Sequence, residues 1–574
     1  MSYIMNVLKI YLVLVFLLII FPIKSQEYDF KFSSPLDIPM FLSGNFGEIR
    51  LDHFHTGIDI KTQGVIGKTV YAVADGYISR IKIQANGYGK ALYITHDNGY
   101  TSVYCHLDHF RDDIRLFVEN EQYKKRTFET DIYLDKSTFK IKEGDSIAVS
   151  GNSGGSGGPH LHFEIRDQYQ QPLNVLRYNI KINDNIKPIF RNIKVYPVEG
   201  GQVNESFNEL KIEAYKANGN YKLIKPVIEV NGKIGFAVEV YDYLNGVSNR
   251  CGIYKLELLL DSSLINQFSI NKLSFNELRY VNAHIDYYEK KINNANFQKL
   301  YKLPNNKLDI YRFTNDGTLE INDTLKHAVK IIAFDAYGNS SELNFYIKGI
   351  ERQLLIDSVK NYNSAKLMKY NERNTFILND IKIDIPAYSL YENLYFNYIK
   401  TNDTESDFPV IYHIHNKYVP VQKYFSLAIK PDSFAEGLEN KTFIALIDED
   451  GLPEYIGGEY KNGFIYTTTR DFGKYILLTD TIMPEIKPIN FVNGSKIENN
   501  NSLVIFIKDN LSEIKDYNGY IDDKWVLFDY DKKNDIIIHT LDEKRYPKNQ
   551  WHNLKLVVSD NMNNLKEANY RFFW

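Results

Sequence analysis

The stretch "GGPHLHFEI", residues 157–165, places two histidines two positions apart in a short apolar run. Side chains at i and i+2 of a β-strand point the same way, so His160 and His162 are predicted to share one face of a strand. The loop before them, "GNSGGSGGP" (residues 151–159), lacks the Gly-Lys-Ser/Thr sequence of a phosphate-binding loop. We interpret it as a tight connector whose small residues let a peptide approach the strand.

An imidazole and a carboxylate upstream complete a set of metal ligands. "HFHTGIDIK" contains His55 and Asp59, four residues apart, which one face of a strand or one helical turn would bring together. Two imidazole nitrogens and one carboxylate oxygen form an open zinc site, the kind that is catalytic rather than structural. His53 is a rival, but Gly57 and not a carboxylate follows it four residues later, so it is left outside the ligand set.

The remaining histidines differ in what surrounds them. His106 ends an alternating run, "YTSVYCH", while His109 follows in an expected turn and is expected to be solvated. Cys105 should point away from His106 and is interpreted as a small buried hydrophobe. A second H-x-H pair, His413 and His415, has neither a glycine loop nor a carboxylate nearby, and we assign it no function.

Residues from about 43 to 166 resemble the lysostaphin/LytM-type zinc metallopeptidases of bacterial cell walls. The pieces that carry the resemblance, in the order of the family, are "HTGIDI", "VYAVADGYI", "GYGKALYITHDNGYTSVYCHL" and "IKEGDSIAVSGNSGGSGGPHLHFEI". The resemblance implies a small, mostly antiparallel β fold with an open groove and one zinc ion per chain. It implies His55, Asp59 and His162 as zinc ligands, and His106 and His160 as unligated catalytic histidines.

The chemistry of such a site is peptide hydrolysis. Zinc activates water near neutral pH and polarises the scissile carbonyl. His106 or His160 would transfer a proton or hydrogen-bond the developing oxyanion, and the spacing leaves open which does which. Glu164 lies two residues past His162 and is expected either to support that ligand or to be a solvated carboxylate at the strand end.

An internal repeat lies outside this region. "HAVKIIAFDAYGNSSELNFYI" (residues 327–347) matches "HNLKLVVSDNMNNLKEANYRF" (residues 552–572), and each reads as a β-hairpin. A D-x-I-x-P segment precedes each copy, beginning at Asp184 and at Asp480. Two immunoglobulin-like β-sandwiches fit this pattern, the first with an insertion.

The fold class is therefore predicted to be mainly β, with several domains because 574 residues are too many for one core. We expect a signal peptide at 1–25, a LytM-type zinc peptidase domain at 26–180 with an insertion at 108–140, an immunoglobulin-like β-sandwich with an insertion at 184–350, a β-rich domain at 351–479 and an immunoglobulin-like β-sandwich at 480–574. The insertion contains "FRDDIRLFVENEQY", a predicted helix with Ile114, Phe117 and Val118 on one side, and it should reshape one wall of the groove.

The N-terminus has the features of an export signal. Lys9 precedes an apolar run over residues 10–21, and Ser25 offers a cleavage point. The run is short for a bilayer span, so an uncleaved anchor is the less favoured alternative. We predict a mature protein in the periplasm or cell envelope, or secreted, with no other transmembrane segment.

The charge balance bears on nucleic-acid binding, and the cysteine content on disulfide formation. Lysine and arginine total 68 and aspartate and glutamate 72, a balance that does not predict a nucleic-acid-binding protein. The two cysteines, Cys105 and Cys251, fall in different expected domains, and whether they pair is left open.

The leading interpretation is an exported zinc endopeptidase that hydrolyses the peptide cross-links of peptidoglycan. One alternative is a non-catalytic LytM-like regulator of other wall hydrolases, which should lack ligands or catalytic histidines, whereas all five positions are filled here. Another is an adhesive or scaffolding protein in which the β-sandwiches bind a protein partner. Because the five residues all precede Asp184, we expect a fragment ending near Asn183 to keep the metal and some activity.

Overall fold

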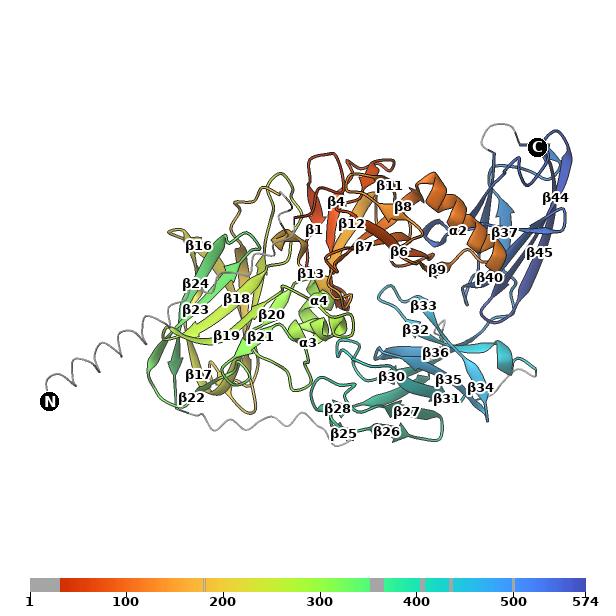
Figure 1. Cartoon of the computed structure of the whole chain (residues 1–574). Helices are drawn as coiled ribbons and strands as arrows, with labels where there is room; N and C mark the ends of the chain where they lie inside the picture. The colour runs from red at the N-terminus through yellow and green to blue at the C-terminus, as the bar shows by residue number, and fades with distance from the viewer. Residues whose placement is uncertain are drawn as a thin grey trace, which may run out of the picture.

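The computed structural model describes residues 31–351 except 179 and 181, then 366–402, 408–432, 437–497 and 501–574. The signal peptide predicted for residues 1–25 lies outside the described residues. The fold is mainly β, as predicted, and its sheets fall into four groups along the chain. We call these the N-terminal unit (31–182), the second unit (183–351), the third unit (366–479) and the C-terminal unit (480–574). In Figure 1 they run from red through green to blue.

The N-terminal unit is built on one antiparallel sheet with strand order β1-β4-β12-β8-β7-β6-β10. These strands span Leu42–Gly44, Ile58–Lys61, His160–Arg166, Thr101–Phe110, Lys90–His96, Gly76–Ile83 and Lys140–Ile141. Four short strands extend it: β13 (Pro172–Leu173) pairs with β12, β9 (Thr130–Tyr133) with β6, β11 (Ser146–Ser150) with β8, and β5 (Thr69–Tyr71) with β11. Separately, β2 (Ile49–Arg50) pairs with β3 (His53–Phe54). A 3-10 turn, η1 (Val175–Arg177), follows. The sheet is mostly antiparallel, as the resemblance implies.

The segment expected as an insertion forms a helix and two edge strands. The helix α2 (Asp112–Lys125) buries Ile114 and Val118, as predicted, while Phe117 is only partly buried and packs at the edge of the core. Strands β9 and β10 both pair with β6, so the segment extends the sheet rather than standing apart from it. Deleting residues 108–140 would therefore remove part of the core.

The second unit has the strand order β14-β16-β17-β24-β23-β18-β19-β21. These strands span Ile189–Pro197, Leu210–Ala217, Asn220–Tyr241, Ser340–Gly349, Lys326–Phe334, Lys255–Leu260, Ser263–Ser269 and Tyr311–Phe313. Its other elements are β15 (Gln202–Val203), η2 (Leu278–Tyr280), α3 (Val281–His284), α4 (Tyr287–Asn293), β20 (Phe297–Lys299) and β22 (Leu319–Ile321). The hairpin β23–β24 is the first copy of the repeat.

The third unit packs two sheets around one core. One has the order β26-β27-β31-β35-β34, spanning Asn374–Ile377, Ile381–Ile385, Phe425–Ile429, Phe464–Thr469 and Glu459–Lys461. The other has the order β29-β30-β36-β32-β33, spanning Tyr398–Asn402, Val410–Ile414, Gly473–Thr479, Thr442–Ile447 and Pro453–Gly457. The small pair β25 (Lys366–Met368) and β28 (Leu394–Phe396) and the turn η3 (Glu439–Lys441) complete it.

The C-terminal unit also has two sheets. One has the order β37-β39-β43-β42, spanning Glu485–Pro488, Ser502–Lys508, Ile536–Thr540 and Asp529–Asp531, and the turn η4 (Lys532–Asn534) follows β42. The other has the order β38-β45-β44-β40-β41, spanning Ser495–Lys496, Leu565–Phe573, Trp551–Asp560, Ile514–Ile521 and Lys524–Val526. The hairpin β44–β45 is the second copy of the repeat, so both copies form hairpins as predicted.

The N-terminal and second units share buried surface beside the predicted metal ligands. Phe46, Ile49 and Phe54 belong to the core of the second unit, although they come from the N-terminal unit. Asn45 Nδ2 donates to the carbonyl of Gly252 at 2.7 Å, and the Asn45 side chain accepts from the Gly252 amide at 2.8 Å. The two units are therefore one packed body at this joint, contrary to the expectation that a fragment ending near Asn183 is self-sufficient.

Two further features are the state of the cysteines and the length of the helices. Cys105 and Cys251 are both buried and free, and Cys105 packs against Ala91, Tyr93 and Val103 as the small hydrophobe that was predicted. None of the helices in the described ranges is long and apolar enough to cross a membrane.

Candidate metal centre

The register between β4 and β12 brings the predicted ligands together. Asp59 on β4 lies directly opposite His162 on β12, and His160 lies opposite Lys61. Gly57 makes this close pairing feasible, because a Cβ at that position would lie 2.4 Å from the carbonyl oxygen of Phe163 and 3.0 Å from the His162 ring.

The side chains of His55, Asp59 and His162 converge on one point. Asp59 Oδ1 lies 3.1 Å from His55 Nε2 and 2.9 Å from His162 Nδ1, and the two ring nitrogens are 3.0 Å apart. All three residues are buried, with 3–4% of each exposed. They form one of the groups in the described part of the chain whose geometry could hold a metal ion.

The outward-facing atoms of these three side chains are all fixed by neighbours. His55 Nδ1 donates to the carbonyl of Asn45 at 2.8 Å, and Arg50 donates to Asp59 Oδ2 at 2.5 Å. His162 Nε2 lies 2.9 Å from Glu164 Oε1. A ligating histidine characteristically donates its second ring N–H to a carbonyl or carboxylate, which leaves the other nitrogen for the metal.

These atoms fit zinc. Ligands on a tetrahedral zinc ion at 2.0–2.2 Å are separated by about 3.3–3.6 Å, and the three separations here are shorter by only a few tenths of an ångström. Nitrogen and carboxylate donors suit zinc, and three protein ligands leave one position for water or substrate. His55, Asp59 and His162 are therefore the residues that would hold the ion.

Glu164 supports His162 and is not a solvated carboxylate. It is fully buried, and Arg166 donates to its Oε2 at 2.6 Å. Thr56 and Tyr88 each donate to its Oε1 at 2.6 Å. Of the two alternatives left open for Glu164, the structure thus selects the partner of the ligand.

Arg50, Thr56, Tyr88 and Arg166 were not identified from the sequence. Thr56 adjoins His55 and Arg166 continues the alternation of His162 and Glu164, so both had a weak signal in the pattern. Tyr88 comes from the turn before β7 and stacks on the His162 ring at 5.3 Å, a contact that no local spacing encodes.

Burial and neighbouring charges shift the pKa values of the metal-free ligands in opposite directions. Burial lowers the pKa of His55 to about 4, so this imidazole is neutral at pH 7 and able to act as a ligand. Burial also disfavours protonated His162, but the hydrogen bonds that this ring donates to the Asp59 and Glu164 carboxylates outweigh it and raise the pKa of His162 to about 9. Metal binding at this centre must therefore displace a proton from His162.

His106 and His160 lie beside the ligands with one ring nitrogen already occupied. His106 Nδ1 donates to the carbonyl of Ser153 at 2.8 Å, and His160 Nδ1 donates to the carbonyl of Gly158 at 2.8 Å. A carbonyl can only accept, so in the neutral rings the lone pair is on Nε2. His160 Nε2 lies 3.4 Å from Asp59 Oδ1, and the His106 and His160 rings are 4.8 Å apart.

The position of His106 depends on a β-bulge in strand β8. His106 is inside β8 rather than at its end, with φ of 59° where the pairing of β8 with β7 shifts register. Such bulges re-aim a side chain. Burial and the adjacent histidines His162 and His160 lower the pKa of His106 to about 3, so the ring is neutral.

The other histidines lie apart from this cluster. His53 is exposed and its Nδ1 donates to the Leu51 carbonyl, outside the ligand set as predicted. His109 is half-exposed and beside Asp108, solvated as predicted, although it lies in β8 and not in a turn. His413 and His415 belong to the third unit and join no metal-capable group among the described residues.

The glycine-rich loop is a tight connector, as predicted, and it also contacts the C-terminal unit. A Cβ on Gly154 would lie 2.3 Å from the amide nitrogen of Gly89. Lys533 donates to the carbonyls of Asn152 and Ser156, the latter at 3.1 Å. The loop is thus held from both sides.

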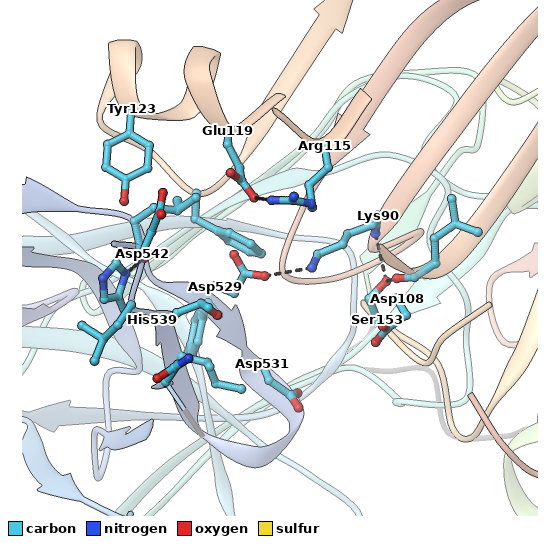
Figure 2. Close-up of a pocket in the computed structure, with 18 of the residues that line it drawn as sticks. Lys90, Asp108, Arg115, Glu119, Tyr123, Ser153, Asp529, Asp531, His539 and Asp542 are labelled. Atoms are coloured by element: carbon cyan, nitrogen blue, oxygen red, sulfur yellow. Dashed lines mark hydrogen bonds and ion pairs between the residues drawn. The ribbon is translucent and has the colours of Figure 1, made fainter. Parts of the chain in front are cut away.

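A cleft of about 960 Å³ lies between α2, this loop and the C-terminal unit. Figure 2 shows Lys90 of the N-terminal unit reaching Asp529 of the C-terminal unit across it, at 2.8 Å. Ser153, whose carbonyl holds His106, lines the same cleft. The cleft is therefore linked to the histidine cluster through Ser153, which lines the cleft and also accepts the hydrogen bond from His106.

Comparisons with known proteins agree with this geometry. Residues 53–125 match the model of peptidase family M23, and residues 365–480 match that of a Zu5-like domain. An uncharacterised metalloprotease of Haemophilus influenzae is 32% identical over 123 residues, 21% of each chain. The DD-carboxypeptidase/endopeptidase Mpg of Neisseria meningitidis is 33% identical over 120 residues, again 21% of each.

A relative with a different printed role also matches. The murein hydrolase activator NlpD of Salmonella dublin is 32% identical over 122 residues, 21% of this chain and 25% of that one. Among solved structures, the catalytic domain of lysostaphin from Staphylococcus simulans is 23% identical, with a TM-score of 0.17, over 22% of this chain and 77% of that one. This chain thus spans about a fifth of the length of the first relatives it matches.

The M23 match includes His55, Asp59 and His106 and ends before β12, which supplies His160 and His162 by pairing with β4. The family match, the relatives named metalloprotease and endopeptidase, and the buried His55–Asp59–His162 cluster agree with one another. The chain therefore carries a domain of peptidase family M23.

Proposed function

We propose that the protein is an exported zinc endopeptidase that cleaves peptide cross-links of bacterial peptidoglycan. The observation that carries the proposal is the convergence of His55, Asp59 and His162 with two further histidines alongside. Similarity to a relative named peptidoglycan DD-endopeptidase, ShyA of Vibrio cholerae, supports the substrate class, which is the peptide stem of the wall polymer. A site on this substrate requires a periplasmic or envelope location, in agreement with the predicted export signal.

The site residues fall into two groups, those that would hold the metal ion and those that would transfer protons. A zinc ion held by the three ligands would supply Lewis-acid chemistry, activating water near neutral pH and polarising the scissile carbonyl. His160 Nε2 faces the ligand cluster, is partly exposed and carries a lone pair, so we assign His160 to accept the proton of the attacking water and pass it to the leaving amine.

His106 is assigned to substrate positioning and to the proton path. Its Nε2 also carries a lone pair because Nδ1 is bound to Ser153, and this nitrogen can accept a hydrogen bond from a water or a peptide N–H. Its ring lies against both His160 and His162. Positioning of this kind is a large part of catalysis when the groups are held rigidly.

The second candidate is a regulator that activates other wall hydrolases, favoured by the similarity to the activator NlpD. The experiment that separates the two is digestion of purified muropeptides and intact sacculi by the zinc-loaded full-length protein, with and without a chelator. Cleavage that the chelator abolishes and zinc restores supports the endopeptidase. No cleavage by the zinc-loaded protein, together with stimulation of an added wall amidase, would instead assign the regulator.

A further inference from the structure

Three aspartates lie together at the end of the second unit, away from the histidine cluster. Asp184 lies in the segment that enters β14, Asp242 directly follows β17, and Asp335 directly follows β23. One carboxylate oxygen from each lies within 4.8 Å of the others. Segments far apart in the sequence thus bring three carboxyl groups to one point.

Backbone and amide groups orient two of these carboxylates. Asp335 Oδ1 accepts from the amides of Tyr337 and Asn339, and its Oδ2 accepts from Asn339 Nδ2 at 2.6 Å. Asp184 Oδ1 accepts from the amide of Ile186 at 3.0 Å. These contacts fix the carboxylates without neutralising their charge.

Two other carboxylate oxygens of the cluster have no hydrogen-bond partner among the described residues. Asp242 is only 2% exposed, and neither its Oδ1 nor Asp184 Oδ2 has a hydrogen-bond partner among the described residues. Among the described residues, the charges that act on Asp184 and Asp242 are those of other aspartates and not of a lysine, arginine or histidine. Burial, reinforced by the charges of Asp184 and Asp335, raises the pKa of Asp242 to about 8. A buried, unpaired carboxylate beside two others is unfavourable unless a cation joins it.

We propose that Asp184, Asp242 and Asp335 bind one Ca²⁺ ion. An all-oxygen, carboxylate-rich site suits a hard cation, whereas zinc prefers nitrogen and sulfur donors. Ca²⁺ binds oxygens at about 2.3–2.6 Å, so two ligands on one ion are at most about 5 Å apart, and the observed spread falls within this limit. Mg²⁺ demands a smaller, near-octahedral shell and dehydrates reluctantly, which makes it the weaker candidate.

The C-terminal unit contains the counterpart of this cluster and shows what distinguishes the two. Asp480, Asp509 and Asp560 form it, and Asn564 Nδ2 bridges Asp560 to the Asp480 carbonyl as Asn339 bridges Asp335 to the Asp184 carbonyl. There, Asp509 Oδ1 is likewise buried without a partner, but the Ser512 hydroxyl donates to Asp480 Oδ2 at 2.6 Å. No such hydroxyl reaches the described Asp184 or Asp242, so the assignment is confined to the cluster in the second unit.

The position of the cluster gives the ion a structural consequence. Leu244, Cys251 and Ala336, close to the aspartates in sequence, pack into the core of the N-terminal unit. Arg177 of the N-terminal unit donates to the Ala336 carbonyl at 3.2 Å. Calcium at this point would tie the connecting segment to two strand ends and so fix the joint between the units. The proposal is independent of the peptidase function.

The test is calcium binding by the full-length protein, stripped of metal and given one equivalent of zinc. Titration calorimetry measures stoichiometry, and thermal unfolding measures stabilisation. We expect Ca²⁺ to raise Tm by roughly 5 °C or more at a hundredfold excess over Kd. Asp242→Asn should bind one Ca²⁺ fewer than the wild type and lose the calcium-induced rise in Tm. Asp509→Asn, in the C-terminal unit, should still bind the Ca²⁺ ion of the second unit and keep that rise.

Asp242→Asn has almost the same shape and no charge to bury, so without calcium its Tm should equal or exceed that of the wild type. If it fails to fold, Asp184→Asn, at a partly exposed position, provides the same measurement. Equal calcium stoichiometry in the wild type and the folded variant, or no calcium binding by the wild type, would overturn the site. Tighter binding of Mg²⁺ than of Ca²⁺ would overturn the choice of ion.

Discussion

The two histidines of β12 have different roles in the metal centre although they share one strand face. His160 and His162 lie on the same side of β12, yet His162 Nδ1 points at Asp59 and His55, while the His160 ring is held by Gly158. Alternation along the strand predicts that the two histidines share a face. The hydrogen-bond partners of each ring then identify His162 as the metal ligand and His160 as an unligated histidine.

The two histidines should respond differently to removal. His162→Ala deletes one of three protein donors, so it should lose both zinc and activity, as should Asp59→Ala. His160→Ala should keep about one zinc per chain and lose turnover by on the order of 100-fold. Elemental analysis beside the endopeptidase rate checks this, and a metal-free His160→Ala with a zinc-loaded His162→Ala would reverse the two assignments.

Glu164 should matter through His162 rather than through substrate. Glu164→Gln keeps an acceptor for His162 Nε2 but removes the charge that pairs with buried Arg166. We expect zinc affinity to fall by about 10–100-fold, the usual effect of changing the partner of a ligating histidine. Competition with a chromogenic chelator measures it. Unchanged affinity in a folded variant would show that Glu164 only balances Arg166.

At the scale of elements, the centre depends on how tightly β4 lies against β12. Gly57 is the residue that permits it, because any side chain there meets the backbone of Phe163. Gly157, in the glycine-rich loop, has nothing within 4 Å of a Cβ at its position. The two glycines therefore have different physical roles within one motif region.

Gly57→Ala and Gly157→Ala form a matched pair. Gly57→Ala should cost about 1–3 kcal/mol of unfolding free energy through overpacking and should weaken zinc binding by shifting His55 relative to His162. Gly157→Ala should leave stability and zinc content within error of the wild type. Denaturant unfolding and zinc analysis of both variants test this, and equal behaviour of the pair would contradict it.

At the scale of the whole molecule, the later units complete the surroundings of the centre. Phe46, Ile49 and Phe54 of the N-terminal unit lie in the core of the second unit. Burying each such side chain contributes about 1.5–3 kcal/mol, so together they approach the total stability of about 5–15 kcal/mol of a typical domain.

A fragment ending at Asn183 should therefore be unstable and poor in zinc, which revises the expectation from the sequence. A fragment ending at Thr479 keeps the second unit and should retain folded structure and zinc. Thermal unfolding and zinc content of the two fragments provide the comparison. A soluble, zinc-loaded and cooperatively folding short fragment would restore the original expectation.

The C-terminal unit contacts the loop that orients both unligated histidines. Lys533 binds the carbonyls of Asn152 and Ser156, whereas adjacent Lys532 pairs with Glu513 inside its own unit. Lys533→Ala should loosen the loop and lower the hydrolysis rate by about tenfold with zinc retained, and Lys532→Ala should not. A higher rate for Lys533→Ala would mean that the contact restrains the enzyme.

The sequence by itself determined the mainly β fold, the repeated hairpins and the helix after β8, because strand alternation and turn spacing are local. Spacing also singled out His55, Asp59 and the H-x-H pair as candidate metal ligands, and the family resemblance chose His162 within that pair. The tertiary structure alone decided which residues support the ligands, since Tyr88, Arg50 and Asn45 reach them through packing between strands distant in sequence. It also decided that the units are not independent. The local sequence pattern around a hydrophobic residue such as Phe54 is the same whichever core the residue enters. Only the packed structure shows that Phe54 enters the core of the second unit.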